Sequence, residues 1–502
     1  MKNSLMEYLE DIASVYPDKA AFSDGTSSIT FCDLLSISKK IGTSLIKLIP
    51  KSKNVLFIAS RSIQYPACLL GILYSGKCFI PIAPDLPISR ILELVEISDA
   101  DTLIYDCHFE AIADSIPSIQ KISVNDLLET QKNSKTLPSV KRISSEVSFI
   151  YYTSGSSGMP KGVALSQLSA IDFGSNLYRD FEYCTDDILG CQTPLYSLAC
   201  MHDFLPCFMK GLTVYLIPTQ FSTFPSSLIK FLSENRVTVL CAMPVVVGRL
   251  ATTGGIDVNK PLSLKKVLFG GEALPTQKYV FWRQHCPDIK MYSCYGLTEV
   301  FTTVLYWQSN RQLAEEEKLP IGKPLSNVEV FLLDENNNIS TTEGEICIKG
   351  VCLSTGYYNN TEATDNHFVI NPVNKKIREW IFRTGDIAFY NEHNELVFKG
   401  RKDFQIKRFG YRVECEEIEI VATQEIGLPN IACVYNAKKK QLLLYYVGEV
   451  DPEDIRGKLV LNLPKYMIPD KIIKLEEMPI SSNGKIDKKA LSDGGAKDGK
   501  ID

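Results

Sequence analysis

The stretch YYTSGSSGMPKG, which runs from Tyr151 to Gly162, combines the residue types that bind an anion. Glycines let the chain turn several backbone N–H groups toward one point, and serine and threonine hydroxyls add further donors. Lys161 contributes a compact positive charge on a long side chain. This composition is typical of a phosphate-binding loop. A flexible Gly/Ser linker has the same composition, so the stretch alone leaves both interpretations open.

Residues Thr153–Lys161 of this stretch are called the phosphate loop from here on. They differ from the loop of the P-loop ATPases. That loop has Gly before its Lys and Ser or Thr after it, whereas Lys161 lies between Pro160 and Gly162. The residues that follow, GVALSQ, are typical of an extended strand, so no helix N-terminus would point at the phosphates. The sequence therefore disfavours a P-loop ATPase.

The elements around the loop predict an α/β fold. VSFIYY is typical of a strand that ends where the loop begins, and α/β folds bind ligands at the carboxyl ends of strands. Apolar strand-like runs alternate with helical segments up to about residue 310, which predicts α/β layers with mostly parallel sheets. Short strands divided by Asn and Gly turns predict a small β-rich lobe over 310–400. The remaining residues, 404–502, are typical of a compact α+β domain.

Composition excludes several classes of function. A chain of 502 residues is long enough for roughly three lobes of about 150 residues each. The net charge of −5 argues against a nucleic-acid partner. Fifteen cysteines without a C-x-x-C pair indicate buried thiols in a reducing compartment. The N-terminus lacks the pattern of a signal peptide, and no apolar run is long enough to span a bilayer, so we expect a cytoplasmic protein without a membrane partner.

Five further motifs follow the phosphate loop in the sequence. They are GGEALP at 270–275, YGLTE at 295–299, FRTGD at 382–386, GRKDFQIKRFGYRVE at 400–414 and NGKID at 483–487. In this order the chain resembles the adenylate-forming enzymes, a superfamily that includes acyl-CoA ligases and the adenylation domains that load carrier proteins. It looks most like the stand-alone ligases that charge D-alanine onto a carrier protein and the amino-acid adenylation domains of peptide synthetases. The resemblance covers nearly the whole chain.

The resemblance implies a reaction in two steps that uses ATP and Mg²⁺. A carboxylate attacks the α-phosphate of ATP, which yields an acyl adenylate and pyrophosphate, and a phosphopantetheine thiol then takes the acyl group. Because the first step adds negative charge to an anionic centre, catalysis has to come from positioning and from cations. The acceptor thiol is expected on a separate carrier protein, because the chain stops soon after Leu491.

The resemblance also assigns roles to residues. Glu299 is the expected magnesium ligand, Thr298 contacts the α-phosphate, and Asp386 accepts hydrogen bonds from the ribose hydroxyls. Alone, Glu299 would be a solvated acid and Asp386 a turn residue. The full set of expected ATP-binding residues is Thr153, Ser154, Gly155, Ser156, Ser157, Gly158, Lys161, Gly271, Glu272, Ala273, Ser293, Cys294, Tyr295, Gly296, Leu297, Thr298, Asp386, Phe398, Arg401 and Lys485.

Lys485 is expected to complete the reactive centre. It follows an Asn-Gly turn and, by resemblance, bridges the attacking carboxylate and the α-phosphate oxygens, so its catalytic role joins those of Thr298 and Glu299. Without the resemblance it would be an exposed charge in a basic tail. We expect an N-terminal core over 1–400 and a mobile lid over 404–502 with a hinge near Asp403, because one site must first exclude water and later admit a thiol.

The expected acid pocket comprises Leu198, His202, Asp203, Gly270 and Thr302. Amino-acid adenylating enzymes place an Asp about 13 residues before a Gly to hold the substrate ammonium. In this chain that position, counted back from Gly211, is Leu198. A buried ammonium would lack a partner there, and Gly270 replaces the Cys of D-alanine ligases, which would open the pocket. Both changes favour an aryl, acyl or atypical acid, although Asp203 is close enough in sequence to bind an amine in a shifted register.

Two alternatives stay open beside the carrier-loading ligase. One is an acyl-CoA ligase that uses free CoA. The other is an inactive nucleotide-binding protein, which the presence of Lys485, Glu299 and Asp386 disfavours.

Overall fold

The computed structural model describes residues 2–129, 143–155, 158–251, 263–309, 311–403, 405–428, 430–437, 439–480, 486–492, 496–497 and 500–501. The chain forms two compact units. The first contains Met1–Ile82, Ser98–Tyr151 and Gly162–Gly400, and the second contains Ala83–Ile97, Tyr152–Lys161 and Arg401–Asp502. The phosphate loop therefore groups with the C-terminal residues, although it lies in the N-terminal third of the sequence.

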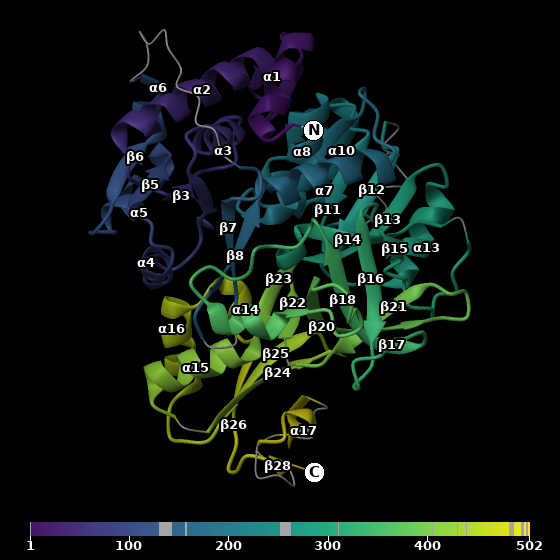
Figure 1. The fold of residues 1–502 in the computed structure, drawn as a ribbon. Helices are drawn as coiled ribbons and strands as arrows, with labels where there is room; N and C mark the ends of the chain where they lie inside the picture. The colour runs from purple at the N-terminus through teal and green to yellow at the C-terminus, as the bar shows by residue number, and fades with distance from the viewer. Residues whose placement is uncertain are drawn as a thin grey trace. The chain divides into compact units, whose positions relative to one another are not determined.

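The first unit contains a nine-stranded sheet with the order β15-β14-β13-β12-β11-β9-β10-β1-β2. Its strands β11 to β15 are labelled in Figure 1. Its strands are β1 (Ala20–Ser23), β2 (Ser28–Thr30), β9 (Ile188–Cys191), β10 (Thr213–Leu216), β11 (Val239–Ala242), β12 (Lys266–Gly270), β13 (Lys290–Leu297), β14 (Thr302–Trp307) and β15 (Lys323–Pro324). The six central strands are parallel, and β2, β14 and β15 pair antiparallel at the edges. This sheet confirms the predicted α/β class.

A second, six-stranded sheet in the same unit has the order β6-β5-β3-β4-β7-β8. Its strands are β3 (Asn54–Ile58), β4 (Cys78–Pro81), β5 (Thr102–Tyr105), β6 (Gln120–Ser123), β7 (Val147–Thr153) and β8 (Lys161–Ser166). β3, β4 and β8 are buried at every residue. β3 and β4 pair parallel, and parallel strands are usually covered on both faces. β7 and β8 flank the phosphate loop, so the expected strands before and after the loop are confirmed.

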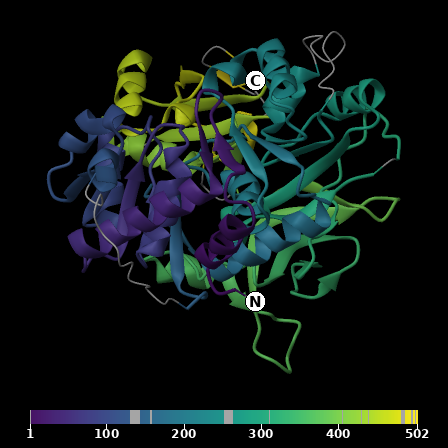
Figure 2. The same cartoon turned by 90° about the horizontal axis from the view of Figure 1, so that it is seen from above.

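Helices cover these sheets. The N-terminal helices α1 (Leu5–Val15) and α2 (Phe31–Leu48), purple in Figure 2, pack on each other. The side chain of Thr30 accepts a hydrogen bond from Asp33 N and so caps the start of α2. The other helices of this unit are α3 (Gln64–Tyr74), α5 (Glu110–Asp114), α6 (Val124–Glu129), α7 (Gln167–Asp180), α8 (Met201–Lys210), α9 (Thr219–Thr223), α10 (Pro225–Glu234), α11 (Pro244–Leu250), α13 (Thr276–His285) and α14 (Thr361–His367), with the 3-10 turns η1 (Cys107–Phe109), η2 (Leu198–Cys200) and η3 (Thr298–Val300).

An antiparallel sheet forms the expected β-rich part of the first unit, green in Figure 1. Its order is β17-β16-β18-β20-β19, with β21 beside β20. The strands are β16 (Val328–Leu333), β17 (Ile339–Ser340), β18 (Glu343–Gly350), β19 (Phe368–Ile370), β20 (Trp380–Tyr390) and β21 (Leu396–Arg401). β20 carries the FRTGD motif.

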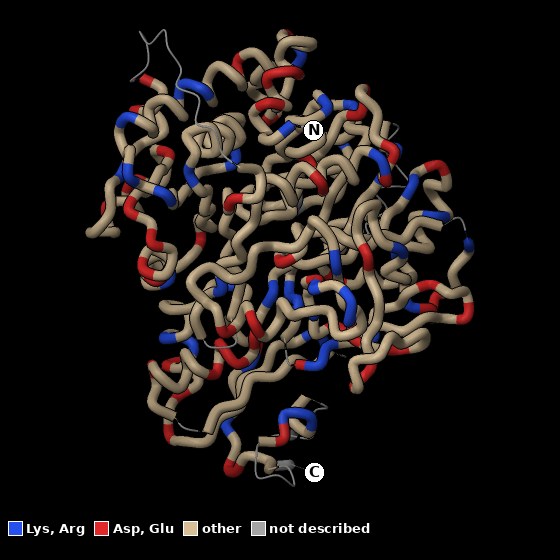
Figure 3. Tube along the Cα trace, viewed as in Figure 1, with Lys and Arg blue, Asp and Glu red and all other residues tan. Residues whose placement is uncertain are grey.

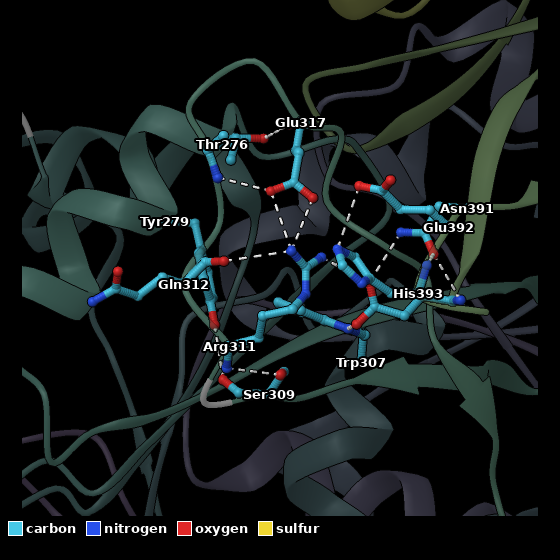
Figure 4. Close-up of polar contacts among 12 residues, drawn as sticks. Thr276, Tyr279, Trp307, Ser309, Arg311, Gln312, Glu317, Asn391, Glu392 and His393 are labelled. Carbon is cyan, nitrogen blue, oxygen red and sulfur yellow. Dashed lines mark hydrogen bonds and ion pairs between the residues drawn. The ribbon is translucent and has the colours of Figure 1, made fainter.

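A partly buried ion-pair cluster joins the segment after β14 to the turn between β20 and β21 (Figure 4). The guanidinium of Arg311 contacts Glu317 at 2.9 Å and Glu395 at 2.8 Å. Glu395 also accepts a hydrogen bond of 2.9 Å from the indole of Trp307 at the end of β14. Because one guanidinium binds two carboxylates, the cluster holds the strand that follows YGLTE close to the hairpin that carries FRTGD.

The second unit contains a three-stranded sheet, β24-β25-β26, and two two-stranded sheets, β22-β23 and β27-β28, with helices. The strands are β22 (Gln405–Arg408), β23 (Tyr411–Glu414), β24 (Ile431–Asn436), β25 (Gln441–Tyr446), β26 (Lys471–Lys474), β27 (Ala496–Lys497) and β28 (Lys500–Ile501), and the helices are α4 (Ile88–Ile97), α15 (Cys415–Ile426), α16 (Pro452–Asn462) and α17 (Lys488–Ser492), with the 3-10 turn η4 (Lys465–Met467). α15 comprises the residues CEEIEIVATQEI. It ends at Gly427, which has a left-handed φ of 78°.

Two global expectations can be compared with the structure. Most cysteines are buried and all are free thiols, as their scattered spacing predicts. Basic and acidic residues occur side by side along the trace (Figure 3), in keeping with the small net charge. Within the described part of the chain, no helix is both long and apolar enough to cross a bilayer.

Candidate active site

The carboxyl ends of β12 and β13 bring two of the motifs together. The strands are parallel, and Gly270 lies beside Cys294 in the register. Gly271, Glu272 and Ala273 therefore leave the sheet next to Ser293–Leu297, at the edge where α/β folds bind ligands. Gly271 has a left-handed φ of 90°, which glycine adopts without strain.

Glycine at position 270 is required by the close approach of these two strands. A Cβ at this position would lie 2.5 Å from the carbonyl oxygen of Cys294 and 3.1 Å from its Cβ. The structure thus provides a steric reason for Gly270 that differs from the expected opening of the acid pocket.

Tyr295 and Asp386 meet although 91 residues separate them. The Tyr295 hydroxyl donates a hydrogen bond of 2.5 Å to Oδ2 of Asp386, and the two residues are 6% and 2% exposed. The backbone N–H of Asp386 donates to the Thr384 hydroxyl at 3.0 Å, which fixes the turn of FRTGD. Two of the expected ATP-binding residues, Tyr295 and the expected ribose-binding Asp386, thus lie side by side. Phe398 on β21 is partly buried against the main core of the first unit.

Glu299 is completely buried in η3. Its Oε1 accepts a hydrogen bond of 2.8 Å from the Tyr357 hydroxyl, and its backbone carbonyl accepts one of 2.8 Å from Ser354 N. Phe301 and Thr302, which follow η3, have left-handed φ values of 55° and 73°. Such strain at two consecutive non-glycine residues is common where a fold must hold a functional side chain.

Tyr357 is a site residue that the sequence analysis missed. Its segment pairs with β8, because Tyr358 N donates to Gly162 O at 2.7 Å and Ala164 N donates to Gly356 O at 3.0 Å. The segment therefore links the strand after the phosphate loop to the acid of YGLTE. Only the aromatic pair in GYYNN marks it in the sequence, and that signal is too weak to assign a role.

Three of the expected acid-pocket residues, Leu198, His202 and Asp203, lie in and around the start of α8, whereas Gly270 ends β12 and Thr302 begins β14. Leu198 is 4% exposed in η2. His202 Nε2 lies 3.2 Å from the Thr302 hydroxyl and 3.0 Å from the Thr303 hydroxyl, so the structure joins α8 to β14. Burial lowers the pKa of His202 to about 4, and the imidazole is therefore neutral at pH 7.

Asp203 is completely buried next to His202. Neither carboxyl oxygen accepts a hydrogen bond of ordinary geometry from the residues that the structure describes, and the weak donor that faces it is the Cys191 thiol. Burial raises the pKa of Asp203 to about 8, against the smaller opposing effects of Cys191 and Arg61. The carboxyl group is thus mostly protonated at pH 7.

The phosphate-loop residues lie in the second unit. The Thr153 hydroxyl donates to Lys161 O at 3.4 Å, and the Ser154 hydroxyl donates to Arg412 O at 2.8 Å. Gly158 has a left-handed φ of 83°. Lys161 is 9% exposed, and its charge helps to offset the burial that raises the pKa of Glu414. Ser156, Ser157 and Lys485 lie outside the described residues.

Arg401 and Asp403 form a bidentate ion pair, also in the second unit. Arg401 Nε and Nη2 lie 2.6 and 2.7 Å from the two carboxylate oxygens of Asp403. Partial burial opposes ionisation of Asp403, but the hydrogen bonds and charge of Arg401 keep its pKa below the usual value. The expected ATP-binding residues therefore form two groups. One lies around Tyr295, Glu299 and Asp386 in the first unit, and the other lies around the phosphate loop in the second unit.

The chain belongs to the AMP-binding enzyme family, whose model matches residues 9–358. Bacitracin synthase 1 of Bacillus licheniformis is 30% identical over 502 residues, which cover 97% of this chain and 9% of that protein. Gramicidin S synthase 2 of Brevibacillus brevis is 29% identical over 506 residues, 97% of this chain and 11% of that protein. The chain thus spans only a small part of the length of these curated relatives.

Solved structures share the fold. The amide bond synthetase McbA from Marinactinospora thermotolerans has a TM-score of 0.86 at 19% identity, with 98% of this chain and 99% of that chain covered. NpsA-ThdA from Klebsiella oxytoca, an artificially fused adenylation and PCP didomain, has a TM-score of 0.81 at 20% identity, with 94% and 93% covered. The resemblance to adenylate-forming enzymes is therefore confirmed at the level of family and fold.

Proposed function

We propose that this protein activates a carboxylic acid with ATP as an acyl adenylate, releases pyrophosphate, and transfers the acyl group to the phosphopantetheine thiol of a carrier protein. The observation that carries the proposal is the contact between Tyr295 and Asp386, which joins two motifs at the ligand-binding edge of the first unit. The family assignment and the peptide-synthetase relatives support the same reaction.

In this proposal the first unit binds the nucleoside and the reacting phosphate. Asp386 binds the ribose, and the Tyr295 hydroxyl holds its carboxylate in place. Gly271 and the backbone groups at 271–273 leave room for the flat adenine ring. Thr298, one residue before Glu299, contacts the α-phosphate, whose charge grows during attack.

The residues around Glu299 fit Mg²⁺. Mg²⁺ is usually held by one or two carboxylates together with substrate phosphates and water, not by a cage of protein ligands. Glu299 supplies one buried carboxylate, and the described residues contain no cluster of three or more His, Cys, Asp or Glu side chains that could hold a metal ion. When bound, Mg²⁺ would neutralise phosphate charge. Tyr357 orients the Glu299 carboxylate through its hydroxyl.

The residues of the second unit act on the phosphates and on the reacting carboxylate. Lys161 and the phosphate loop bind the β- and γ-phosphates, Arg401 reaches the ribose and phosphate region, and Lys485 bridges the carboxylate and the α-phosphate. The hinge near Asp403 and the boundaries 1–400 and 404–502 belong to the same proposal. A buried positive charge stabilises the negative charge that develops during the attack more strongly than bulk water does.

The substrate is an acid without an α-ammonium group. The position that would hold an ammonium is occupied by Leu198, and the nearby His202 is neutral. Burial raises the pKa of Asp203 to about 8, so without a cation beside it this carboxyl group carries little negative charge at pH 7. We therefore favour an aryl, acyl or atypical acid over an α-amino acid.

The test is a panel of aryl, acyl and amino acids with the purified chain, ATP and Mg²⁺. We expect acid-dependent release of pyrophosphate and formation of AMP, with at least one non-amino acid preferred over all α-amino acids. Formation of ADP, or no pyrophosphate with any acid, would contradict the proposed reaction. Preference for an α-amino acid would contradict only the proposed substrate class.

A further inference from the structure

Two buried charged side chains hold the phosphate loop within the second unit. Arg90 on α4 and Glu417 on α15 form an ion pair, and their side chains are 6% and 0% exposed. Arg90 also donates a hydrogen bond of 2.6 Å to Glu93. Burying an ion pair of this kind costs free energy unless both side chains make further hydrogen bonds. The phosphate loop provides those hydrogen-bond partners.

The pair contacts the loop backbone on both sides of its turn. Gly155 N donates a hydrogen bond of 3.1 Å to Oε2 of Glu417, and Arg90 Nη1 donates one of 3.2 Å to the carbonyl oxygen of Gly158. A Cβ on Gly158 would lie 2.9 Å from Ile420 of the same helix α15. The loop backbone is thus in close contact with α15 through both a hydrogen bond and packing.

The hydrogen bond from Gly155 N to Glu417 occupies a donor that a phosphate oxygen would also use. A backbone N–H in a glycine-rich loop is the donor that such a loop offers to a phosphate oxygen. A carboxylate oxygen has the same charge sign and the same acceptor chemistry as a phosphate oxygen. One N–H makes one strong linear bond, so Glu417 and a phosphate oxygen compete for Gly155.

We propose that Glu417 is a positioning residue that replaces phosphate at Gly155 once pyrophosphate has left, with Arg90 holding Glu417 in place. The inference rests on the proposed function, in which the loop binds phosphates during adenylation and has no phosphate to bind during thioester formation. The clamp formed by Arg90 and Glu417 stabilises the loop in the second half-reaction and opposes the return of pyrophosphate.

The test compares Glu417→Gln with the wild type in the full-length protein. Glutamine keeps the shape of the side chain but removes the charge that competes with phosphate. We expect inorganic pyrophosphate to bind about threefold to tenfold more tightly to Glu417→Gln than to the wild type. Calorimetry in the absence of the acid substrate measures this binding. We also expect a lower KM for ATP in pyrophosphate exchange and slower thioester formation from supplied acyl adenylate. Glu416→Gln, a change at the neighbouring acid that makes none of these contacts, is the matched control and should match the wild type.

The outcomes separate this inference from the proposed function. Equal or weaker binding of pyrophosphate to Glu417→Gln would overturn the proposed competition. If Glu417 only supported the loop structurally, its replacement would not make the protein bind pyrophosphate more tightly. Failure of both wild type and variant to bind ATP or pyrophosphate would overturn the proposed function itself. If Glu417→Gln does not fold, hydrogen exchange of the wild type decides. Pyrophosphate should speed exchange at the start of α15, and unchanged or slower exchange there would reject the inference.

Discussion

Lys485 is the residue whose role depends least on the described structure and most on its motif. We predict that Lys485→Ala lowers the rate of acyl adenylate formation by about a hundredfold or more, because the reacting phosphate loses its positive partner. Thioester formation from supplied acyl adenylate should stay near the wild-type rate. Separate assays of the two half-reactions check this. Lys489→Ala, at an exposed lysine four residues away, is the control. Equal loss of both half-reactions would mean that Lys485 has another role.

Asp203 is the residue for which the structure predicts a pH dependence. Its pKa is about 8 in the folded protein and near 3.8 without burial, so the folded protein binds more protons between about pH 4 and pH 8. The contribution of Asp203 to stability is therefore greatest below pH 4 and falls as the pH rises toward 8, by at most about 1.4 kcal/mol per pH unit.

Asp203→Asn removes this titration. We expect the free energy of unfolding of Asp203→Asn, relative to wild type, to increase steadily from pH 5 to pH 8 in urea unfolding experiments. His202 contributes with the opposite sign below about pH 6.5, because its pKa is lowered by burial, but it is present in both proteins. Asp186→Asn, which changes an exposed carboxylate, should show no such trend. A constant difference across this pH range would show that Asp203 is ionised in the fold.

At the scale of elements, the segment around Tyr357 connects β8 to η3. We predict that Tyr357→Phe raises the Mg²⁺ concentration needed for half-maximal pyrophosphate exchange by about tenfold, because the Glu299 carboxylate loses the hydroxyl that orients it. Electron paramagnetic resonance of Mn²⁺ in the presence of ATP provides a readout other than activity. We expect the variant to bind Mn²⁺ more weakly than the wild type does.

The adjacent tyrosine provides the matched control for this element. The Tyr358 hydroxyl contacts Asn54 and Asp99, away from Glu299. Tyr358→Phe should therefore leave the Mg²⁺ requirement unchanged. If the two variants behave alike, the segment supports the fold only, and the orientation of Glu299 does not depend on Tyr357.

At the scale of the whole molecule, the acceptor of the acyl group distinguishes a carrier-loading ligase from a CoA ligase. We predict that the preferred acid, once identified, is transferred to a phosphopantetheinylated carrier protein at least about tenfold faster than to free CoA. Mass spectrometry of a carrier-protein panel and of CoA measures both products. Equal rates, or a CoA thioester as the main product, would favour the CoA ligase.

Much of the fold could be predicted because its causes are local. The bounds of α2 and α15 follow from a capping threonine, an apolar stripe and a terminal glycine within a few residues of each other. The α/β class follows from strands that alternate with helices. The grouping of 83–97 and 152–161 with the C-terminal residues could not be predicted, because contacts between distant segments leave no periodic signal in either segment.

For the site, the sequence alone determined the family and the residues proposed to carry the chemistry, since the motifs identify the family and Glu299, Asp386 and Lys161 stand within them. Only the tertiary structure decided what those residues contact. The Tyr295 hydroxyl reaches Asp386 across 91 residues, Tyr357 reaches Glu299 across 58, and Gly155 donates to Glu417 across 262. Such pairs form because the sheets and helices bring distant segments together during folding, and neither partner's sequence neighbourhood specifies the other.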